Sequence, residues 1–385
     1  MKNVLWLVSW YPNRLDKLDG DFIQRHAKAV ALFCKVHVIY IKKDDSLPAN
    51  TTSTENYRSG NLTEQVIYYN SSRTGMRFLD RFISQLKYDQ CYRESIRKYI
   101  AQNGKPDHVH VHVAMKAGLA ALWIKKKWNI PFIVTEHWTG YHVQASPSVY
   151  NYGLLFRRMN RKILKEAALF LPVSSNLGET VKQNFVNIPY TVVPNVVDTG
   201  LFYFKPVNLI KFRFIHVSNM TYQKNPENIF KACSLLEQKG YDFEMLMLGA
   251  KDEMLLLKAK AHNLDERIVF FKDPVPYAEV AVQMQNSSAL LLFSRFENLP
   301  CVILEALCCG LPVISSDVGG IAEVIDETNG ILVENGNTEQ LVKAMQQVMD
   351  NYGMYDRSAI AAKAAEKFNY DTVGNLYLHA YNNTP

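Results

Sequence analysis

Segments of two kinds alternate along almost the whole chain: short apolar runs rich in β-branched and aromatic residues, and longer runs with the period of an α-helix. This alternation of strands and helices occurs in two successive sets along the chain. Strands are predicted first at 4–9, 36–41, 66–69, 108–113, 132–135, 169–173 and 191–193, and then at 212–217, 243–248, 268–271, 289–293, 313–315 and 331–333. Helices are predicted between them at 22–33, 76–101, 116–127, 151–167 and 176–184, and then at 226–239, 252–262, 277–285, 301–309 and 338–349. Because a strand needs a crossover to reach a parallel neighbour, the pattern predicts two doubly wound α/β domains.

The domain boundaries follow from where this alternation stops and restarts. A chain of 385 residues has the length of two ordinary domains. The irregular segment 198–207, which contains Pro206, is the predicted joint between an N-terminal domain at 1–200 and a second domain at 207–368. Residues 369–385 fit no strand–helix unit, and we expect them to form a helix that packs back on the N-terminal domain. The polar segment 42–64 shows no periodicity and predicts a loop.

Composition excludes several classes of protein. The net charge of +6 is small and dispersed, so it does not indicate nucleic-acid binding, although it suits phosphorylated small molecules or an anionic membrane surface. No apolar run reaches the roughly 18 residues of a transmembrane helix, and the first strand is too short for a signal peptide. The six cysteines form no C-x-x-C pair and no disulfide framework. We therefore expect a cytoplasmic protein.

Common catalytic and metal-binding motifs are missing from the chain. It has no phosphate-binding G-x-x-x-x-G-K-[ST] loop, no G-x-G-x-x-G after a strand, no H-E-x-x-H and no G-x-S-x-G. Two weaker patterns remain. Asp19-Gly20-Asp21 is either a metal site or a turn before a helix, and the alternating His108, His110 and His112 are either metal ligands or a polar strand end that lines a cleft.

One stretch after the strand at 289–293 combines several signals. Glu297 lies in the loop that follows the strand, and Pro300 is placed to open the helix at 301–309. Gly310 is placed to end that helix, and Glu305 lies just over one turn inside it. In parallel sheets ligands bind beyond the carboxyl ends of the strands, so the start of this helix should face the cleft between the domains.

The chemistry of this stretch suits an anion that carries hydroxyl groups on both sides. The free amides at the start of a helix attract a phosphate. A carboxylate in the loop and another one turn along the helix can then accept hydrogen bonds from hydroxyls at either end of that phosphate. A nucleotide sugar has this form, and the sequence therefore predicts a nucleotide-sugar site around Glu297 and Glu305.

These residues give the chain a resemblance to the glycosyltransferase group 1 family, also described as glycosyltransferase family 4. Its E-x7-E hallmark is met by Glu297 and Glu305, and its G-G-x-x-E by the segment 319–323. The P-N-G-V-D that precedes the family's second domain is similar to the P-N-V-V-D at 194–198. The first domain matches at Gly20, at the H-x-H of 110–112 and at the segment 135–137, so the resemblance covers nearly the whole chain.

The resemblance assigns roles to individual residues. It implies catalytic roles for Glu297, which contacts hydroxyls of the donor sugar, for Lys224, which neutralises the diphosphate, and for His137, which follows a strand of the first domain. It also implies that Glu305 holds the ribose hydroxyls. The remaining donor-binding residues that it implies are Gly20, Asn219, Arg295, Asn298, Leu299 and Val302.

Two positions depart from the family pattern. Asn219 stands where many members have an arginine, and Val196 replaces the glycine of P-N-G-V-D. Losing an arginine removes a bidentate contact to phosphate, so Lys224, the helix amides and Arg295 are left to stabilise the leaving group.

The family implies a GT-B fold, with two Rossmann-like domains that face each other across a cleft. It also implies a retaining, metal-independent transfer that needs no cofactor. The expected partners are a nucleotide-diphosphate sugar and a glycan or lipid-linked acceptor in bacterial-type polysaccharide or glycolipid synthesis. A non-catalytic nucleotide-sugar-binding subunit and a nucleotide-sugar epimerase remain as alternatives, and the base, sugar and acceptor remain open.

The segment 73–88 mixes large apolar residues with basic ones. At helical spacing Phe78, Phe82 and Leu86 form one stripe, with Arg77, Arg81 and Lys87 around its edges. Either this helix packs on its own sheet with a solvated basic rim, or it makes a peripheral contact with the anionic inner face of a membrane.

Overall fold

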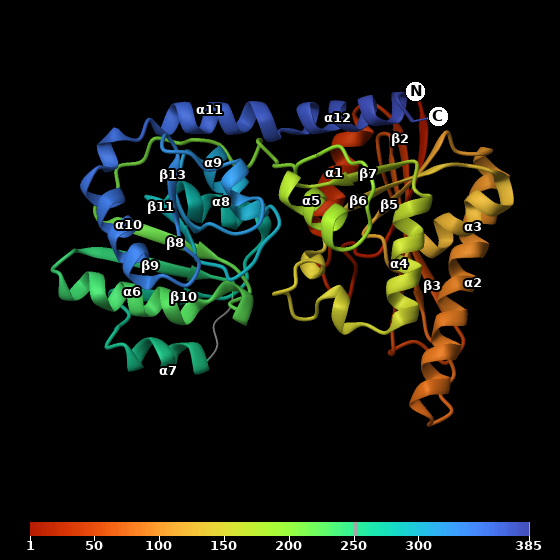
Figure 1. Cartoon of the computed structure of the whole chain (residues 1–385), viewed down its shortest axis with the longest axis horizontal. Coiled ribbons are helices and arrows are strands. Elements are labelled where there is room, and N and C mark those ends of the chain that lie inside the picture. Colours follow the sequence, from red (N-terminus) through yellow and green to blue (C-terminus); the bar gives the residue numbers. More distant parts are fainter. Residues whose placement is uncertain (250–252, 385) are drawn as a thin grey trace.

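Strands that are buried on both faces dominate the first half of the chain. In the computed structural model, which describes residues 1–249 and 253–384, they form a seven-stranded sheet of order β3-β4-β2-β1-β5-β6-β7 (Figure 1). The strands are β1 (Asn3–Val8), β2 (Lys35–Lys43), β3 (Thr52–Ser59), β4 (Leu62–Tyr69), β5 (His108–His112), β6 (Phe132–Glu136) and β7 (Leu169–Pro172). The helices are α1 (Asp21–Ala31), α2 (Arg77–Asn103), α3 (Gly118–Trp128), α4 (Leu154–Glu166) and α5 (Ser175–Asn184).

A second, six-stranded parallel sheet has the order β10-β9-β8-β11-β12-β13. Its strands are β8 (Phe212–Val217), β9 (Phe243–Leu248), β10 (Val269–Lys272), β11 (Ala289–Leu292), β12 (Val313–Ser316) and β13 (Gly330–Val333). The helices are α6 (Pro226–Gln238), α7 (Glu253–Ala261), α8 (Tyr277–Gln285), α9 (Cys301–Cys308) and α10 (Thr338–Asp350). The first residue of the helix predicted at 252–262 lies outside the described residues.

The two sheets share one topology. Counted from its own first strand, the second sheet has the order 3-2-1-4-5-6 of a Rossmann fold, and the first sheet has the same order with β3 added at its edge. In both, the strand order reverses between two central neighbours, which are β1 and β5 in the first sheet and β8 and β11 in the second. The predicted pair of doubly wound α/β domains is confirmed.

The first strand illustrates how the parallel strands are buried. Leu5 and Leu7 pack into the core that contains α2 and α3, whereas Val4, Trp6 and Val8 pack into the core beneath α1 and the C-terminal helix. All five side chains are fully buried. Burying one large apolar side chain contributes about 1.5–3 kcal/mol, so a continuous apolar run specifies a central strand covered on both faces.

The loop predicted at 42–64 is wrong, because β2 extends to Lys43 and β3 and β4 form an antiparallel hairpin. Gly60 has a φ of 57° in the two-residue connection between them, a conformation that glycine adopts without strain. Most side chains of β3 are exposed, so this edge strand shows no apolar alternation in the sequence. The strand predicted at 191–193 is also wrong, although Thr191 and Val193 donate backbone hydrogen bonds to the edge of β7.

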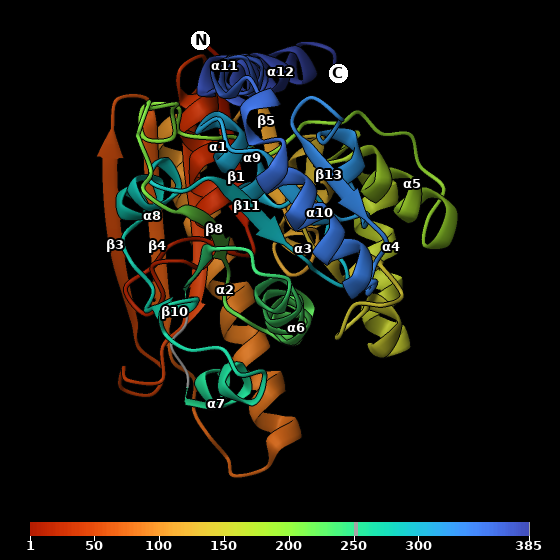
Figure 2. The same cartoon turned by 90° about the vertical axis from the view of Figure 1, so that its left-hand side faces the viewer.

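Two helices at the end of the chain run along one side of both domains (Figures 1 and 2). α11 (Arg357–Phe368) packs on α9, and α12 (Tyr370–Asn382) packs on α1 of the N-terminal domain. Asn369 joins them and caps α12. The chain therefore passes between the domains twice, and the two passages are joined where Val197 donates a backbone hydrogen bond to Phe368. Among the described residues, no helix has the length and apolar character needed to cross a membrane.

Candidate active site at the strand ends of both domains

The switch point of the second sheet brings the predicted catalytic residues together. The loop after β8 carries Asn219 and Lys224, and the loop after β11 carries Arg295 and Glu297. Because β8 and β11 are neighbours with crossovers that leave in opposite directions, these two loops lie at the switch point of the sheet, where open α/β sheets bind ligands.

Lys224 and Glu297 form a direct ion pair between these two loops. Their side chains are 17% and 6% exposed. Arg295 supports the loop that carries Lys224, since its guanidinium donates to the Tyr222 carbonyl at 3.2 Å and to Asn225 Oδ1 at 2.9 Å. Asn219 is exposed, and its Oδ1 accepts a hydrogen bond from Thr221 at 3.1 Å. Lys224 is therefore the cation that this pair of loops places beside Glu297.

The helix that follows Glu297 begins at the same edge of the sheet. Pro300 is the N-cap residue of α9, and no side chain caps the first turn, where Val302 lies. Gly310 follows the last turn with a φ of 72°, as expected of a glycine that ends a helix. Gly319 approaches the backbone so closely that a Cβ there would lie 2.0 Å from the Glu297 carbonyl oxygen. The G-G-x-x-E segment therefore holds the Glu297 loop in place.

Glu305 lies inside α9 and is buried. Tyr277 Oη, at the start of α8, donates to Glu305 Oε1 at 2.7 Å, and Arg25 Nη2, on α1 of the N-terminal domain, lies 3.5 Å from the same oxygen. Burial raises the pKa of the Glu305 carboxyl group, and the adjacent Arg25 guanidinium acts in the opposite direction. The structure thus places a residue of each domain against this carboxylate.

Gly20 and His137 are the predicted site residues that belong to the N-terminal domain. Gly20 precedes α1 with a φ of 63°, and a Cβ there would lie 2.6 Å from the backbone of Trp10, so only glycine fits. His137 follows β6, and its Nε2 lies 3.2 Å from His112 Nδ1. Burial, and secondly His26, lower the pKa of His137 well below its usual range. His137 is therefore a neutral imidazole at the boundary between the domains.

Residues predicted to bind the donor also join the two domains. Asn298 Nδ2 donates to the His137 carbonyl at 2.7 Å, and its Oδ1 lies 2.7 Å from His142 Nε2. The Leu299 carbonyl accepts a hydrogen bond from Asn195 at 2.6 Å. Contacts between the two domains are thus made by residues of the predicted donor site itself.

Another contact between the domains is made by Glu323. The carboxylate of Glu323 accepts backbone hydrogen bonds from Ser175 and Asn176, both at 2.8 Å, at the start of α5. This contact joins the G-G-x-x-E segment to the N-terminal domain.

The sequence did not identify four of these residues as parts of the site, namely Arg25, His142, Asn195 and Tyr277. Asn195 carried a signal, because it is the asparagine of the P-N-V-V-D segment. The other three carried none, because each meets its partner through tertiary contacts between elements distant in the chain.

Neither weak metal pattern gathers free ligands. Asp19 accepts hydrogen bonds from Tyr40 and Lys42, both at 2.7 Å, and Asp21 pairs with Arg25. His110 is fully buried beneath α12, with Nδ1 2.6 Å from Tyr381 Oη, so its expected position along the cleft is wrong. Within residues 1–249 and 253–384, no group of three or more possible metal ligands is found.

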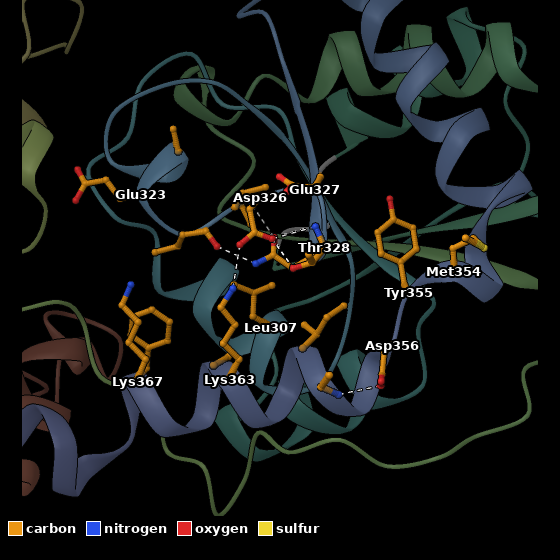
Figure 3. A pocket seen from close by; sticks show the side chains of 18 of the residues that line it. Leu307, Glu323, Asp326, Glu327, Thr328, Met354, Tyr355, Asp356, Lys363 and Lys367 are labelled. Atoms are coloured by element: carbon orange, nitrogen blue, oxygen red, sulfur yellow. Dashed lines mark hydrogen bonds and ion pairs between the residues drawn. The ribbon is translucent and has the colours of Figure 1, made fainter.

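Two of the cavities in the structure bear on where the site lies. One of about 450 Å³ opens at the carboxyl ends of β1, β2 and β4, and its lining includes Trp10, Lys42, Tyr88 and Lys116. A larger cavity of about 930 Å³ lies between α11 and the segment before β13 (Figure 3). Its charged groups include the ion pair of Lys363 and Asp326 at 3.0 Å, and it does not include the predicted catalytic residues. The smaller cavity contains none of the predicted catalytic residues either, but Asp19 in its lining directly precedes Gly20.

The start of α2 projects from the N-terminal domain. Phe78 is 80% exposed, Phe82 57% and Leu86 53%, whereas from Tyr88 onward the helix is anchored by buried side chains. The expectation that this stripe packs on its own sheet is therefore wrong. Leu155, at the start of α4, is also 75% exposed, and Figure 1 shows the free ends of both helices pointing to the same side of the molecule.

Two doubly wound domains that meet at their strand-end loops, with a charged pair and a helix N-terminus at the switch point, define the GT-B class of glycosyltransferases. Two family models cover nearly the whole chain: "Glycosyltransferase Family 4" matches residues 27–201 and "Glycosyl transferases group 1" matches residues 204–367. The protein belongs to the glycosyltransferase group 1 family and is a glycosyltransferase.

Named relatives extend over most of the chain. The putative teichuronic acid biosynthesis glycosyltransferase TuaC of Bacillus subtilis is 23% identical over 358 residues, which are 89% of this chain and 88% of TuaC. N-acetyl-alpha-D-glucosaminyl L-malate synthase of Bacillus anthracis is 25% identical over 300 residues, or 73% of this chain and 76% of that enzyme.

Solved structures share the fold at low sequence identity. Sucrose-phosphate synthase from Thermosynechococcus elongatus superimposes with a TM-score of 0.80 at 17% identity, over 99% of this chain and 98% of that one. HepE from Anabaena, in complex with UDP, gives a TM-score of 0.72 at 14% identity, over 99% and 100% of the two chains.

Proposed function

We propose that the protein is a retaining glycosyltransferase. In this proposal it moves a sugar from a nucleotide-diphosphate sugar to a glycan or lipid-linked acceptor in polysaccharide or glycolipid synthesis, without a metal ion or cofactor. The observation that carries the proposal is the ion pair of Lys224 and Glu297 at the switch point, beside the uncapped start of α9. In the proposal, the cation and the free amides bind the diphosphate of the donor, and the carboxylate accepts hydrogen bonds from the hydroxyls of its sugar.

The proposed reaction breaks the bond between the anomeric carbon and the diphosphate oxygen, whose electron pair stays on the diphosphate. Lys224 Nζ and the first amides of α9 stabilise this growing negative charge, which is the main electrostatic requirement of the step. The acceptor hydroxyl forms the new bond on the same face of the sugar, and its proton passes to the departing phosphate oxygen. Glu297 orients the sugar through its hydroxyls.

The contacts of the two glutamates argue against a glycosidase-type reaction. Retaining glycosidases place two carboxyl groups about 5–5.5 Å apart across the scissile bond. Here Glu297 is paired with Lys224, and Glu305 is buried against Tyr277 and Arg25 inside a different set of contacts. We follow the family resemblance in assigning Glu305 to the ribose and Glu297 to the sugar.

We assign the acceptor to the cavity of about 450 Å³ in the N-terminal domain. It combines aromatic rings, which can pack on a sugar, with Lys42 and Lys116 at its rim. It opens beside the loop of Asp16 and Asp19 that leads to Gly20, so an acceptor there would face the donor. A role in glycoconjugate synthesis is supported by relatives named for teichuronic acid and malate glycosides.

The test begins with a thermal-shift screen of UDP, GDP and ADP, followed by incubation with the matching radiolabelled sugar nucleotides and an acceptor panel. Transfer of label with retention of the anomeric configuration, seen by NMR, supports the proposal. Binding without turnover would make the protein a nucleotide-sugar-binding subunit, and release of a free epimerised sugar would make it an epimerase. Either result would overturn it.

We further propose that the exposed stripe of Phe78, Phe82 and Leu86, with Arg77 and Arg81 at its edges, contacts an anionic membrane. Each Lys or Arg near such a surface contributes about 1 kcal/mol, which gives weak, reversible and salt-sensitive binding. Sedimentation with anionic and neutral vesicles at low and high salt tests this. Recovery with anionic vesicles at low salt alone is expected, and equal recovery in the supernatant under all four conditions would refute the contact.

A further inference from the structure

Arg25 is a buried arginine of the N-terminal domain whose side chain contacts the Glu305 carboxylate of the second domain. We propose that Arg25 is a positioning residue for the donor: together with Tyr277 it fixes the Glu305 carboxylate so that the enzyme selects a ribonucleotide over its 2′-deoxy analogue. The proposal rests on the proposed function, because it takes Glu305 as the residue that holds the ribose hydroxyls.

The geometry holds the guanidinium on three sides. Arg25 Nη1 donates to Asp21 at 2.7 Å, one turn earlier on α1, and Nη2 lies 3.5 Å from Glu305 Oε1. The guanidinium carbon lies 4.6 Å from the centre of the Tyr277 ring. The side chains of Arg25 and Glu305 are only 7% and 6% exposed. Such a pair is fixed in place rather than exchanging with water.

The same contacts leave one oxygen of the Glu305 carboxylate without a hydrogen bond from the described residues of the protein. Arg25 and Tyr277 both reach Glu305 through Oε1, and no hydrogen bond to Oε2 is found among the described residues. A carboxylate can accept about four hydrogen bonds, so Oε2 can take the two ribose hydroxyls. Arg25 Nε is also buried without a hydrogen-bond partner. The ion pair thus keeps, within the described part of the chain, one unmet donor, Arg25 Nε, and one acceptor oxygen without a protein partner, Glu305 Oε2, for a polar ligand.

A buried ion pair would be an inefficient way to hold the two domains together if that were its only role. Burying two charges costs several kcal/mol each, and apolar residues of similar size often stabilise a protein more. Arg25 lies on α1 of the N-terminal domain and Glu305 on α9 of the second domain, so their contact depends on how the two domains are placed.

Arg25 also affects the charge of Glu305. The charged and titratable groups that face Glu305 are Arg25 and Asp21 on α1, Tyr277 on α8 and, on α9 and at its end, Cys301, Cys308 and Cys309. Arg25 is the cation of this set, and it opposes the rise in the pKa of Glu305 that burial causes. Without it the carboxyl group would take up a proton at higher pH and lose acceptor capacity toward the ribose.

The experiment measures dissociation constants of the full-length protein for UDP and 2′-deoxy-UDP between pH 6 and 8, with the GDP and ADP pairs in parallel. The ratio of the two constants isolates the 2′-hydroxyl, because titration of the phosphate cancels. Hydrogen bonds to a charged group correspond to a ratio of about 10–150 in the wild type. In Arg25→Gln we expect a ratio of about 3 or less. As the pH falls, the remaining preference for UDP over 2′-deoxy-UDP should disappear at a higher pH than in the wild type.

Other variants separate positioning from simple stabilisation. Arg25→Lys keeps the charge and should keep the wild-type pH profile with a reduced ratio, whereas Tyr277→Phe, which removes only a hydroxyl, should lower the ratio without unfolding the protein. Glu323→Gln breaks a different contact between the domains and should leave the ratio unchanged. A wild-type ratio and pH profile in both Arg25→Gln and Tyr277→Phe would overturn the inference, as would an equal loss in Glu323→Gln. Failure of the wild type to bind any of the three nucleoside diphosphates would instead refute the proposed function.

Discussion

The ion pair of Lys224 and Glu297 allows stability and catalysis to be separated by substitution. Replacing Lys224 with Met leaves Glu297 as a buried carboxylate without its cation. Removing one partner of a buried pair costs about 3–5 kcal/mol. Because the Lys224 side chain is 17% exposed, we expect the lower end of this range, about 3 kcal/mol. For a domain of this size that corresponds to a fall of about 6–12 °C in the melting temperature.

The same substitution removes the charge that stabilises the leaving diphosphate. Loss of one preorganised electrostatic contact to a developing anion typically lowers kcat by about 10²–10³-fold. The double variant Lys224→Met/Glu297→Gln removes both charges, so no unpaired buried ion remains and most of the lost stability should return. Activity should not return, because neither charge is restored. Glu297→Gln alone should lower turnover more than donor affinity, since orientation of the sugar is what it removes.

The assays are thermal unfolding of all four proteins and transfer of radiolabelled sugar from the donor found in the nucleotide screen. The Arg267→Gln variant is a control, because it alters an ion pair on the surface of the same domain. The reasoning is refuted if the double variant recovers activity together with stability. It is also refuted if Lys224→Met melts and transfers sugar as the wild type does.

Three further outcomes are expected. Glu305→Ala should weaken donor binding by about 1.5–3 kcal/mol, measured by titration calorimetry, and an unchanged affinity would contradict its assignment to the ribose. Treatment with EDTA should leave transfer unchanged, whereas a strict requirement for Mn²⁺ would point back to Asp19 and Asp21. Burial lowers the pKa of each histidine in a set at the core of the N-terminal domain, to about 4 in one case, so the neutral forms are the stable ones in the folded state. Because unfolding then takes up protons below the unfolded pKa of about 6.5, the stability from these neutral histidines is present above that pH and falls toward pH 4. The fall is up to about 1.4 kcal/mol per pH unit for each histidine. Equal melting temperatures at pH 7.5 and 5.5 would contradict this for the set His26, His110, His112 and His137.

The sequence predicted most of the fold, because the central parallel strands are continuous apolar runs whose period and length differ from those of the helices. It failed at β3, where a strand at the edge of the sheet exposes its side chains and shows no apolar pattern. It also failed at the start of α2, since spacing alone cannot show whether an apolar stripe faces the sheet or the solvent.

The candidate site was predicted where its residues follow strands of one sheet. Lys224 and Glu297 are 73 residues apart, yet the strand order brings their loops together. The doubly wound pattern of the domain implies that order. The contact of Arg25 with Glu305 depends instead on how two separate domains are oriented. No local pattern records that orientation, so this residue became visible only in the structure.

The position of α12 has a consequence for how the protein is made. Trp6, on the first strand, lies 6.3 Å from the ring of Tyr377, and His110 contacts Tyr381 near the end of the chain. During synthesis the first domain is complete in sequence long before the helix that covers this face of its sheet has been translated. Until then its apolar and imidazole groups lack the cover that α12 provides, and closing contacts between such distant residues is slow. A ribosome that stalls before residue 370 would release an aggregation-prone chain, although every strand of both sheets had been made.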